Sequence, residues 1–276
     1  MEAATVVTVI RPRRGWAFPP FRELWRYRDL LGILSVRDVK LRYRQTALGA
    51  AWVVLQPILG AGVFAFLFGT VADLPTGGLP PLLFSYAGLL GWNAFATILT
   101  KCGNSLVSNT HLVSKIYFPR LLLPLSTVPP VLLDTAIALV VMITLYAVFG
   151  VAPPLAVLLL PLWLLGVVLL AVGAGLVTSA LAVRFRDVQY VVPVVLGLLV
   201  FATPVGYSRD AVPENARLLF SVNPMVGYLE GFRWSLLPGM RLSTGAVAYS
   251  AVVTLVVLLA GALAFTRMER RFADVI

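Results

Sequence analysis

Six long apolar stretches dominate this chain and restrict it to one class of fold. A helix needs about 20 predominantly apolar residues to cross the hydrocarbon core of a bilayer. Inside that core each segment has to satisfy its own backbone hydrogen bonds, as a helix does. The sequence therefore predicts an all-α integral membrane protein with six transmembrane helices. The predicted spans are residues 48–71, 82–102, 121–149, 155–183, 188–207 and 245–266.

The basic residues predict the orientation of these spans. Eighteen of the 22 Lys and Arg residues lie before the first span, around the second and fourth connections, or after the sixth span. The first and third connections carry none, and the fifth, about residues 208–244, carries the other four. Because basic residues concentrate on the cytoplasmic side, both termini are predicted to be cytoplasmic, in a multi-pass protein of the plasma (inner) membrane.

The composition leaves room for one membrane domain and argues against other classes of protein. Of the 276 residues, 59% are hydrophobic and 12% charged. The net charge of +10 lies mainly beside the spans, where topology and anionic lipid headgroups account for it, so no nucleic-acid partner is predicted. Cys102 and His111 are each the only residue of their type, which excludes an intramolecular disulfide and a multi-histidine metal site. No metal site is predicted, and no cofactor bound by this chain.

The residues before the first span divide into two parts. Residues 1–20 contain three prolines and are predicted to be a flexible arm. Residues 21–34 place apolar side chains at helical spacing, with charged residues on the other face, which predicts an amphipathic interface helix on the cytoplasmic membrane surface. A soluble helix that packs on cytoplasmic protein is the alternative. A basic elbow then continues to residue 47, and the six-span domain covers residues 48–276.

The fifth connection, residues 208–244, is too long for a turn and too polar for a full span. Two of its stretches, 218–222 and 225–237, are apolar enough to enter the membrane, and Asn223 and Pro224 separate them. Irregular backbone at that depth is tolerated only where it is buried in protein or faces water. We therefore predict two short re-entrant or interfacial helices between spans five and six.

Asp134 is the only carboxylate well inside a predicted span. An acid at that depth is a candidate ion or proton site. Pro129 and Pro130 lie just before it and predict a kinked or late-starting helix, so Asp134 can instead cap a helix that restarts there. We favour the capping role, because a single acid makes a poor proton relay, and the ion site is the alternative.

The fourth span carries a row of small residues at a spacing of four, Ala171, Gly175 and Ser179. Such a row lets two helix backbones approach closely in a membrane. It predicts close packing on a neighbouring helix rather than a binding site.

The chain has membrane spans typical of a transporter, but its sequence shows no motif that would supply energy for transport. It contains no G-x-x-x-x-G-K-[ST] loop for a nucleotide and no apparent catalytic constellation. The connection over residues 104–118 is long enough for a short helix parallel to the membrane, where a partner can dock. These observations predict a transport subunit that is not itself an enzyme and is driven by a separate ATPase.

An ordered set of short motifs is similar to one family. The motifs are RYRQTALG at 42–49, followed by Trp52 and LQP at 55–57, KIYFPR at 115–120 with LPLS at 123–126, RFRDV at 184–188, NPM at 223–225 and ERRFAD at 269–274. Together they resemble the permease subunits of ABC-type polysaccharide exporters, which carry O-antigen, capsule, teichoic acid or galactan. The background rich in arginine, alanine and valine is similar to the actinobacterial members, for which a lipid-linked cell-wall galactan would be the cargo.

The resemblance implies a homodimer bound to two copies of an ABC ATPase subunit, with ATP and Mg on the ATPase. The dimer would move a polyprenyl-pyrophosphate-linked polysaccharide from the cytoplasm to the outer side of the plasma membrane, through a channel lined largely by spans one and five. The implied channel residues are Trp52, Gln56, Phe64, Phe68, Phe201 and Tyr207. Ordinary aromatic belts and lipid-facing rings are the alternative for the aromatic ones.

The resemblance also assigns residues near both membrane faces. The implied mouth for the lipid pyrophosphate is Arg37, Lys40, Arg42 and Arg44, for which topology and anionic lipid are the alternative. The implied gate helix contains Phe21, Trp25, Arg26 and Arg28. The implied ATPase coupling residues, within 104–118, are Asn109, His111, Lys115 and Tyr117. The implied outer gate, within 208–244, contains Asn223, Pro224 and Tyr228.

Three other functions stay open at this point. A related ABC permease for a drug, haem or another lipid would share the same architecture. A membrane-embedded glycosyl- or lipid-transferring enzyme would show paired acids or a metal cluster near one membrane face, and none is apparent in the sequence. An ion-driven lipid flippase would require Asp134 to titrate.

Overall fold

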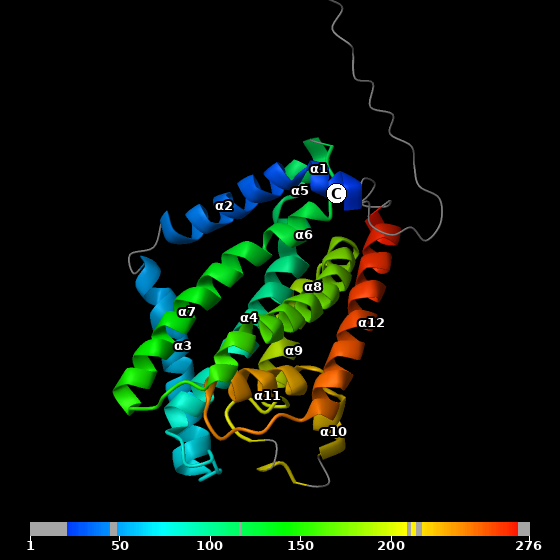
Figure 1. Ribbon diagram of the computed structural model, residues 1–276. Helices are drawn as coiled ribbons and strands as arrows, with labels where there is room; N and C mark the ends of the chain where they lie inside the picture. Colours follow the sequence, from blue (N-terminus) through cyan, green and yellow to red (C-terminus); the bar gives the residue numbers. More distant parts are fainter. Residues whose placement is uncertain (1–20, 45–48, 116, 209–210, 214–216, 270–276) are drawn as a thin grey trace, which may run out of the picture.

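The computed structural model describes residues 21–44, 49–115, 117–208, 211–213 and 217–269. The arm predicted over residues 1–20 and the end of the predicted elbow lie outside this part. Every regular element within the described residues is a helix (Figure 1). In chain order the helices are α1 (Phe21–Arg26), α2 (Arg28–Arg44), α3 (Gly49–Phe64), the π-helix η1 (Ala65–Val71), α4 (Pro81–Ser108), α5 (Thr110–Lys115), α6 (Leu122–Ser126), α7 (Val128–Phe149), the 3₁₀-helix η2 (Leu155–Leu159), α8 (Leu160–Arg184), α9 (Val188–Leu199), α10 (Arg217–Val222), α11 (Met225–Leu236) and α12 (Thr244–Met268).

Five helical segments of the described chain are long and apolar enough to cross a membrane. They are Ala51–Val71, Pro81–Ser108, Leu122–Phe149, Leu155–Arg184 and Thr244–Met268. These segments agree closely with five of the six predicted spans. The fifth predicted span, residues 188–207, is regular helix only over the 12 residues of α9, about 18 Å at the usual helical rise.

Prolines stand at the start of three long helices. Pro81 lies in the first turn of α4, Pro129 in that of α7 and Pro161 in that of α8. Proline fits these positions because the N–H groups of a first turn have no partner inside the helix. Since α6 ends at Ser126 and α7 begins at Val128, the third span is interrupted where its prolines predict a kink or a late start.

α4 is the central helix of the bundle. It contacts α3, α7, α8 and α11, and 78% of its most apolar window is buried within the chain. Its large side chains Phe84, Tyr86 and Ile98 are almost completely inaccessible. The Tyr86 hydroxyl donates to the carbonyl of Ala138 on α7 at 2.8 Å, which satisfies the one polar atom of that ring.

α8 packs closely between α4 and α12. A Cβ added at Gly175 would lie 2.6 Å from the Sγ of Cys102 on α4, so no larger residue fits there. On the other side, a Cβ added at Gly261 of α12 would run into the carbonyl of Gly173 on α8. The first contact confirms the close packing predicted from the small-residue row of span four.

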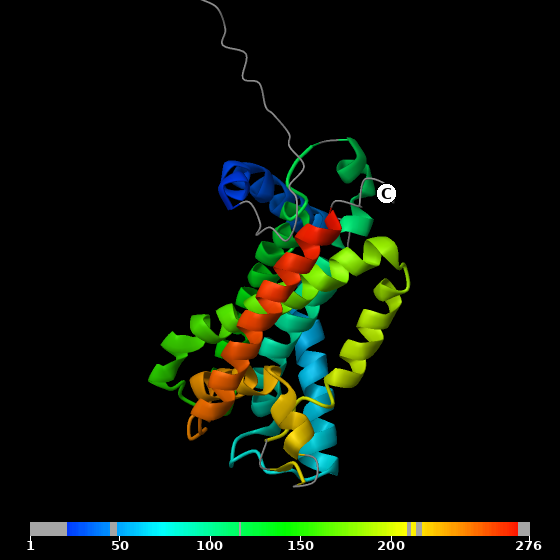
Figure 2. The ribbon, with the colours of Figure 1, turned by 90° about the vertical axis from the view of Figure 1, so that its right-hand side faces the viewer.

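Two groups of short helices lie at opposite ends of the bundle (Figures 1 and 2). α1, α2, α5 and α6 gather at one end together with the last turn of α12, and we call this the α2 end. α10 and α11 lie at the other end, called the α11 end, where the sequence predicts two short helices. α2 lies across its end of the bundle, and the Ser35 hydroxyl fixes it to α6 by donating to the carbonyl of Ser126 at 3.0 Å.

α2 is longer than the amphipathic helix predicted over residues 21–34. A break at Tyr27 separates α1 from α2, and α2 then continues through the first eight residues of the predicted basic elbow to Arg44. Residues 37–44 contain neither proline nor glycine and are rich in arginine, lysine and leucine, which propagate a helix well. The first part of the predicted elbow is therefore regular helix, continuous with α2.

Candidate functional site

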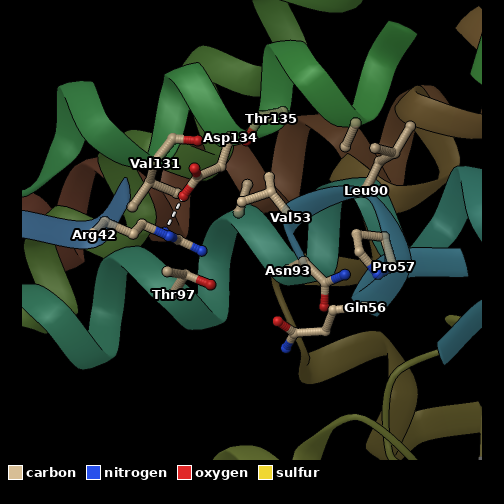
Figure 3. Close-up of a pocket in the computed structure, with 12 residues that line it drawn as sticks. Arg42, Val53, Gln56, Pro57, Leu90, Asn93, Thr97, Val131, Asp134 and Thr135 are labelled. Carbon is tan, nitrogen blue, oxygen red and sulfur yellow. Dashed lines mark hydrogen bonds and ion pairs between the residues drawn. The ribbon is translucent and has the colours of Figure 1, made fainter. Parts of the chain in front are cut away.

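A polar crevice lies between α2, α3, α4 and α7 (Figure 3). Its volume is about 90 Å³. Six polar side chains from the four helices line it, namely Arg42, Gln56, Asn93, Thr97, Asp134 and Thr135. Polar and charged groups inside a membrane bundle are costly unless they are paired, and they mark functional sites. This crevice is therefore the first candidate site of the described chain.

An ion pair forms part of the lining of the crevice. The Arg42 guanidinium donates to the carboxylate of Asp134, which joins α2 to α7 across 92 positions of sequence (Figure 3). The Arg42 side chain is 31% exposed and that of Asp134 only 13%. Because the pair is largely withdrawn from solvent, its attraction is screened much less than that of a surface pair.

Asp134 is not a helix cap, so the capping role predicted for it was wrong. α7 begins at Val128 after an N-cap at Thr127, and no side chain caps that end. Asp134 lies nearly two turns further along the helix, where its carboxylate meets Arg42 instead. This pairing compensates the charge of an acid inside the bundle and favours a structural role over a proton relay.

Sequence reasoning did not assign a role to a polar row on α4. Asn93, Thr97 and Lys101 follow one another at a spacing of four and so share one face of the helix. Asn93 and Thr97 line the crevice, and Lys101 is close enough to Arg42 and Asp134 to interact electrostatically with both. The spacing of three polar residues in an apolar span was the signal that could have identified the row.

A second polar contact joins α2 to the end of α4. Arg37 donates to the Oδ1 of Asp38 at 2.8 Å and to the Oδ1 of Asn109 at 3.0 Å. Asn109 in turn donates from its Nδ2 to the carbonyl of Ser105 at 2.8 Å. Since Asn109 separates α4 from α5, these bonds connect α2 to the start of the predicted coupling helix.

The four predicted mouth residues have different environments. Arg37 and Arg42 bond to residues of the bundle, whereas Lys40 is exposed. Arg44 ends α2, but its side chain lies outside the described part. Two of the predicted phosphate ligands therefore hold α2 in place, and part of the hydrogen-bonding capacity of each guanidinium group is used by these partners. Their role in the mouth stays a prediction.

The predicted gate residues lie on α1 and at the start of α2. Trp25 is 70% exposed, and the guanidinium carbon of Arg28 lies 5.2 Å from its ring centroid, a cation–π contact. Arg26 is also exposed, and Phe21 begins α1, although its side chain is outside the described part. Further large apolar side chains continue this exposed surface along α2, namely Ile33, Val36 and Leu41.

The predicted coupling residues surround a short helix that projects at the α2 end (Figure 2). α5 covers Thr110–Lys115, in the middle of the segment predicted as 104–118. His111, Lys115 and Tyr117 are all exposed, and Tyr117 is 62% exposed. These side chains are therefore accessible to a partner, while Asn109 faces α2.

Four of the predicted channel aromatics meet near the junction of α3 and η1. Phe64 stacks on Phe201 with ring centroids 6.0 Å apart, and Phe68 lies 5.1 Å from Tyr207. A fifth ring, Phe220 of α10, lies 6.2 Å from that of Tyr207 and was not predicted. This aromatic cluster connects the first span, the turn after α9 and α10.

Gly206 makes the aromatic cluster possible. A Cβ at this position would lie 2.6 Å from the ring of Phe64 and 2.6 Å from that of Phe68. The Tyr207 hydroxyl donates to the carbonyl of Phe201 at 2.7 Å, which holds the turn between them. The close approach of backbone and rings explains why a residue without a side chain stands here.

The other two predicted channel residues lie on α3, away from the aromatic cluster. Trp52 is 48% exposed, and Gln56 is exposed beside the polar crevice. Only 11% of the apolar window of Ala51–Val71 is buried within the chain. The first span therefore presents a largely uncovered apolar face.

Asn223 connects the predicted outer gate to the turn after α9. Its Nδ2 donates to the Oγ1 of Thr203 at 2.8 Å, and its Oδ1 accepts from the backbone N–H of Met225 at 3.0 Å. Pro224 follows as the N-cap residue of α11. One amide side chain thus fixes both the start of α11 and its position against residue 203.

Tyr228 of α11 is buried in the bundle. Its hydroxyl lies 2.7 Å from the Oγ1 of Thr254 and donates to the carbonyl of Ser250 at 3.3 Å, both on α12. With only 5% of its surface exposed, Tyr228 anchors α11 on α12. In this conformation Tyr228 does not line an open path.

The sequence is similar to known proteins along most of the chain. A family model described as "ABC-2 type transporter" matches residues 29–237, which is more than half of the sequence. The chain belongs to the ABC-2 type transporter family. The match begins in α2 and ends just after α11, so it includes the polar crevice, the aromatic cluster and the predicted outer gate.

Several curated relatives of this ABC-2 protein are named for polysaccharide transport. The O-antigen export system permease protein RfbA of Myxococcus xanthus is 32% identical over 255 residues, which are 92% of this chain and 97% of the relative. The protein of the same name from Klebsiella pneumoniae is 27% identical over 249 residues, 90% of this chain and 95% of the relative. The polysialic acid transport protein KpsM of Escherichia coli is 26% identical over 243 residues, 86% of this chain and 92% of the relative.

The similarity and the fold agree on the class of protein. Its relatives are permeases, and the described chain is an all-helical bundle with five helices able to cross a membrane. The ABC-2 protein is therefore a multi-pass membrane component of a transporter.

Proposed function

We propose that this protein is the membrane subunit of an ATP-driven exporter that moves a polyprenyl-pyrophosphate-linked polysaccharide, of the O-antigen or galactan type, out of the cytoplasm. The observation that carries the proposal is similarity over nearly the full length to permeases named for O-antigen export and polysialic acid transport. Related ABC permeases for drugs or other lipids share the family, but these relatives favour a glycan.

The α2 end is the cytoplasmic end in this proposal. The start of α1 and the end of α12 lie at that end (Figure 1), as expected for an even number of crossings. Six crossings result if α9 and the turn that follows it count as the fifth span. The concentration of basic residues near α2, α5 and the end of α12 supports this orientation in the plasma (inner) membrane.

The export channel forms between two copies of the chain. The support is the uncovered face of the first span together with α9, in which only Leu196 is buried. In a homodimer these faces of α3 and α9 line one channel. The predicted residues Trp52, Gln56 and Phe201 then face the glycan, because flat aromatic rings and amides contact sugars without holding any one of them tightly.

A separate ATPase supplies the energy and binds the ATP and Mg. Two copies of it dock on the two α5 helices through His111, Lys115 and Tyr117, which are exposed at the α2 end. The motion that follows ATP binding reaches α2 through Asn109 and Arg37, since these two side chains are hydrogen-bonded. ATP biases the dimer because it binds the closed ATPase pair more tightly than the open one.

The lipid pyrophosphate enters at α2. Arginine suits that anion because its planar fork donates two parallel charge-assisted hydrogen bonds. Lys40 is exposed and accessible at once, whereas Arg37 and Arg42 first leave Asn109 and Asp134. The mouth is therefore completed only as α2 moves, which couples substrate entry to the conformation of the bundle.

Co-purification tests this function. The chain is co-expressed with its genomic neighbours, from which the ATPase is expected, and purified in mild detergent. We expect equal amounts of both subunits, loss of the ATPase with Lys115→Glu, and no loss with Arg186→Glu, an equal charge reversal at another exposed position. A strain without the gene should retain its surface polysaccharide inside the cell. Recovery of the permease alone, with normal surface polysaccharide in that strain, would contradict the proposal.

A further inference from the structure

A large cavity lies at the α11 end, apart from the polar crevice and the aromatic cluster. Its volume is about 640 Å³, within the range of about 300–1,000 Å³ that is typical of small-molecule sites. Three parts of the chain that are distant in sequence contribute its walls: the loop before α4 together with the start of α4, Ser208 after α9, and α11 together with the loop that follows it. The polar side chains that line it are Thr76, Ser208, Glu230, Arg233, Arg241 and Ser243.

Two loops with left-handed glycines form the rim of this cavity. Gly77 has φ +69° and Gly239 has φ +75°, conformations that residues with a Cβ rarely adopt. The loops meet where the Cε of Met240 lies 3.0 Å from the position of a Cβ on Gly77. The Thr76 hydroxyl donates to the carbonyl of Leu79 at 2.6 Å, so the first loop is held by its own hydrogen bond. The conformation of the rim is therefore fixed by contacts within and between the two loops.

A buried arginine forms the floor of the cavity. Arg233 is 4% exposed, and its Nη2 donates to the carbonyls of Pro204 and, at 2.6 Å, Val205. Its guanidinium carbon lies 4.4 Å from the ring centroid of Phe84. Burial lowers the pKa of Arg233 to about 10, so the group is still charged at neutral pH. Its Nε has no hydrogen-bond partner in the described structure, which leaves a donor of a buried cation unsatisfied.

A carboxylate lies beside this cation. Glu230 is three residues before Arg233 and shares its face of α11. It also lines the cavity and is partly exposed. An acceptor-only carboxylate and a donor-only guanidinium together can bind the neighbouring hydroxyl groups of a sugar, because each hydroxyl both donates and accepts. The same carboxylate opposes a free phosphate, so the site favours a hydroxylated ligand.

We propose that this cavity is a binding site for one sugar unit of the exported glycan, held through its hydroxyl groups by Glu230 and Arg233. The inference rests on the proposed function, which supplies a glycan at the outer face. In this role the cavity binds the polymer weakly once the polymer has left the channel. The binding opposes movement of the polymer back into the channel between ATP-driven steps. These residues are not part of the aromatic cluster, whereas Glu230 and Arg233 lie on α11 with Tyr228, within the segment predicted to contain the outer gate.

Ligand-observed NMR on the complete permease–ATPase complex in lipid nanodiscs tests the site. The probe is a lipid-free oligosaccharide released from the surface glycan of the producing strain. We expect saturable binding to the complex, weakened at least tenfold by Glu230→Gln, which keeps the shape of the side chain, and abolished by Met240→Trp, which fills the cavity. Leu155→Trp is the matched control, since it adds the same ring at an exposed position of η2.

The outcomes separate this site from the proposed function. Equal binding by the complex and by both cavity variants overturns the site. So does the absence of binding to a complex whose ATPase still responds to the lipid-linked glycan. A permease that recruits no ATPase instead contradicts the proposed function itself. Elution volume and ATP hydrolysis verify that each variant is folded, and Glu230→Gln alone decides the matter if Met240→Trp does not fold.

Discussion

The ion pair between Arg42 and Asp134 gives a quantitative prediction about stability. Exposed pairs contribute about 0.2–1 kcal/mol, whereas removing one partner of a fully buried pair costs about 3–5 kcal/mol. The Arg42 side chain is 31% exposed and the Asp134 side chain 13%, so the pair is closer to a buried pair than to an exposed one. We therefore expect Asp134→Leu or Arg42→Met alone to lower the free energy of unfolding by about 2–3 kcal/mol. The loss is the cost of leaving the remaining charge unpaired in the bundle.

The double variant distinguishes this explanation from a general defect. Arg42→Met with Asp134→Leu removes both charges of the pair, so that neither partner is left without the other, and we expect it to lie within about 1 kcal/mol of the wild type. Unfolding by SDS in mixed micelles, followed by circular dichroism, gives all four free energies of the cycle. Single variants that each cost less than about 0.5 kcal/mol, or a double variant that costs their sum, would refute the reasoning.

Three further predictions concern other contacts of the bundle. Gly261→Leu should prevent folding, because its side chain would occupy the space of the Gly173 backbone; detergent-soluble yield measures this, and a normal yield contradicts the packing. Asn223→Ala should destabilise the α11 end by about 1–2 kcal/mol, because the Asn223 side chain loses its hydrogen bonds to Thr203 and to the start of α11. Hydrogen exchange should then become faster at the α11 end and stay unchanged at the α2 end. Asn109→Ala should leave ATPase binding intact but reduce export several-fold per ATP hydrolysed, because it breaks the connection to α2; unchanged export per ATP would exclude that route.

Much of the fold was predictable because a membrane demands long apolar segments. Five predicted spans correspond to helices of suitable length, and the short helices α10 and α11 lie on either side of Asn223 and Pro224, as expected. The fifth span was predicted too long as a helix. Pro204 and Gly206 lie within it, and both residues interrupt regular helix. They were the available signal that α9 ends early.

The candidate sites were less predictable, because they depend on contacts between distant segments. Nothing in the spacing of Arg42 and Asp134 indicates that they pair, and local proline chemistry favoured a cap instead. Arg233 was counted only as one of the basic residues of the fifth connection. It is buried because the carbonyls of Pro204 and Val205 replace water around its guanidinium group. The composition counts Arg233 as a charged residue but gives no information on the groups that surround it in the fold.

The central position of α4 has a consequence for how the protein is made. Spans enter the membrane in chain order, and α4 is the second, while its neighbours α7 and α8 are synthesised later. Until those helices arrive, Asn93, Thr97 and Lys101 have no complete protein environment, and lipid is a poor substitute for it. The stable insertion of α4 therefore depends on sequence that has not yet left the ribosome. A chain that stops before α7 would leave its polar row unshielded, and cellular quality control would recognise it as unfinished.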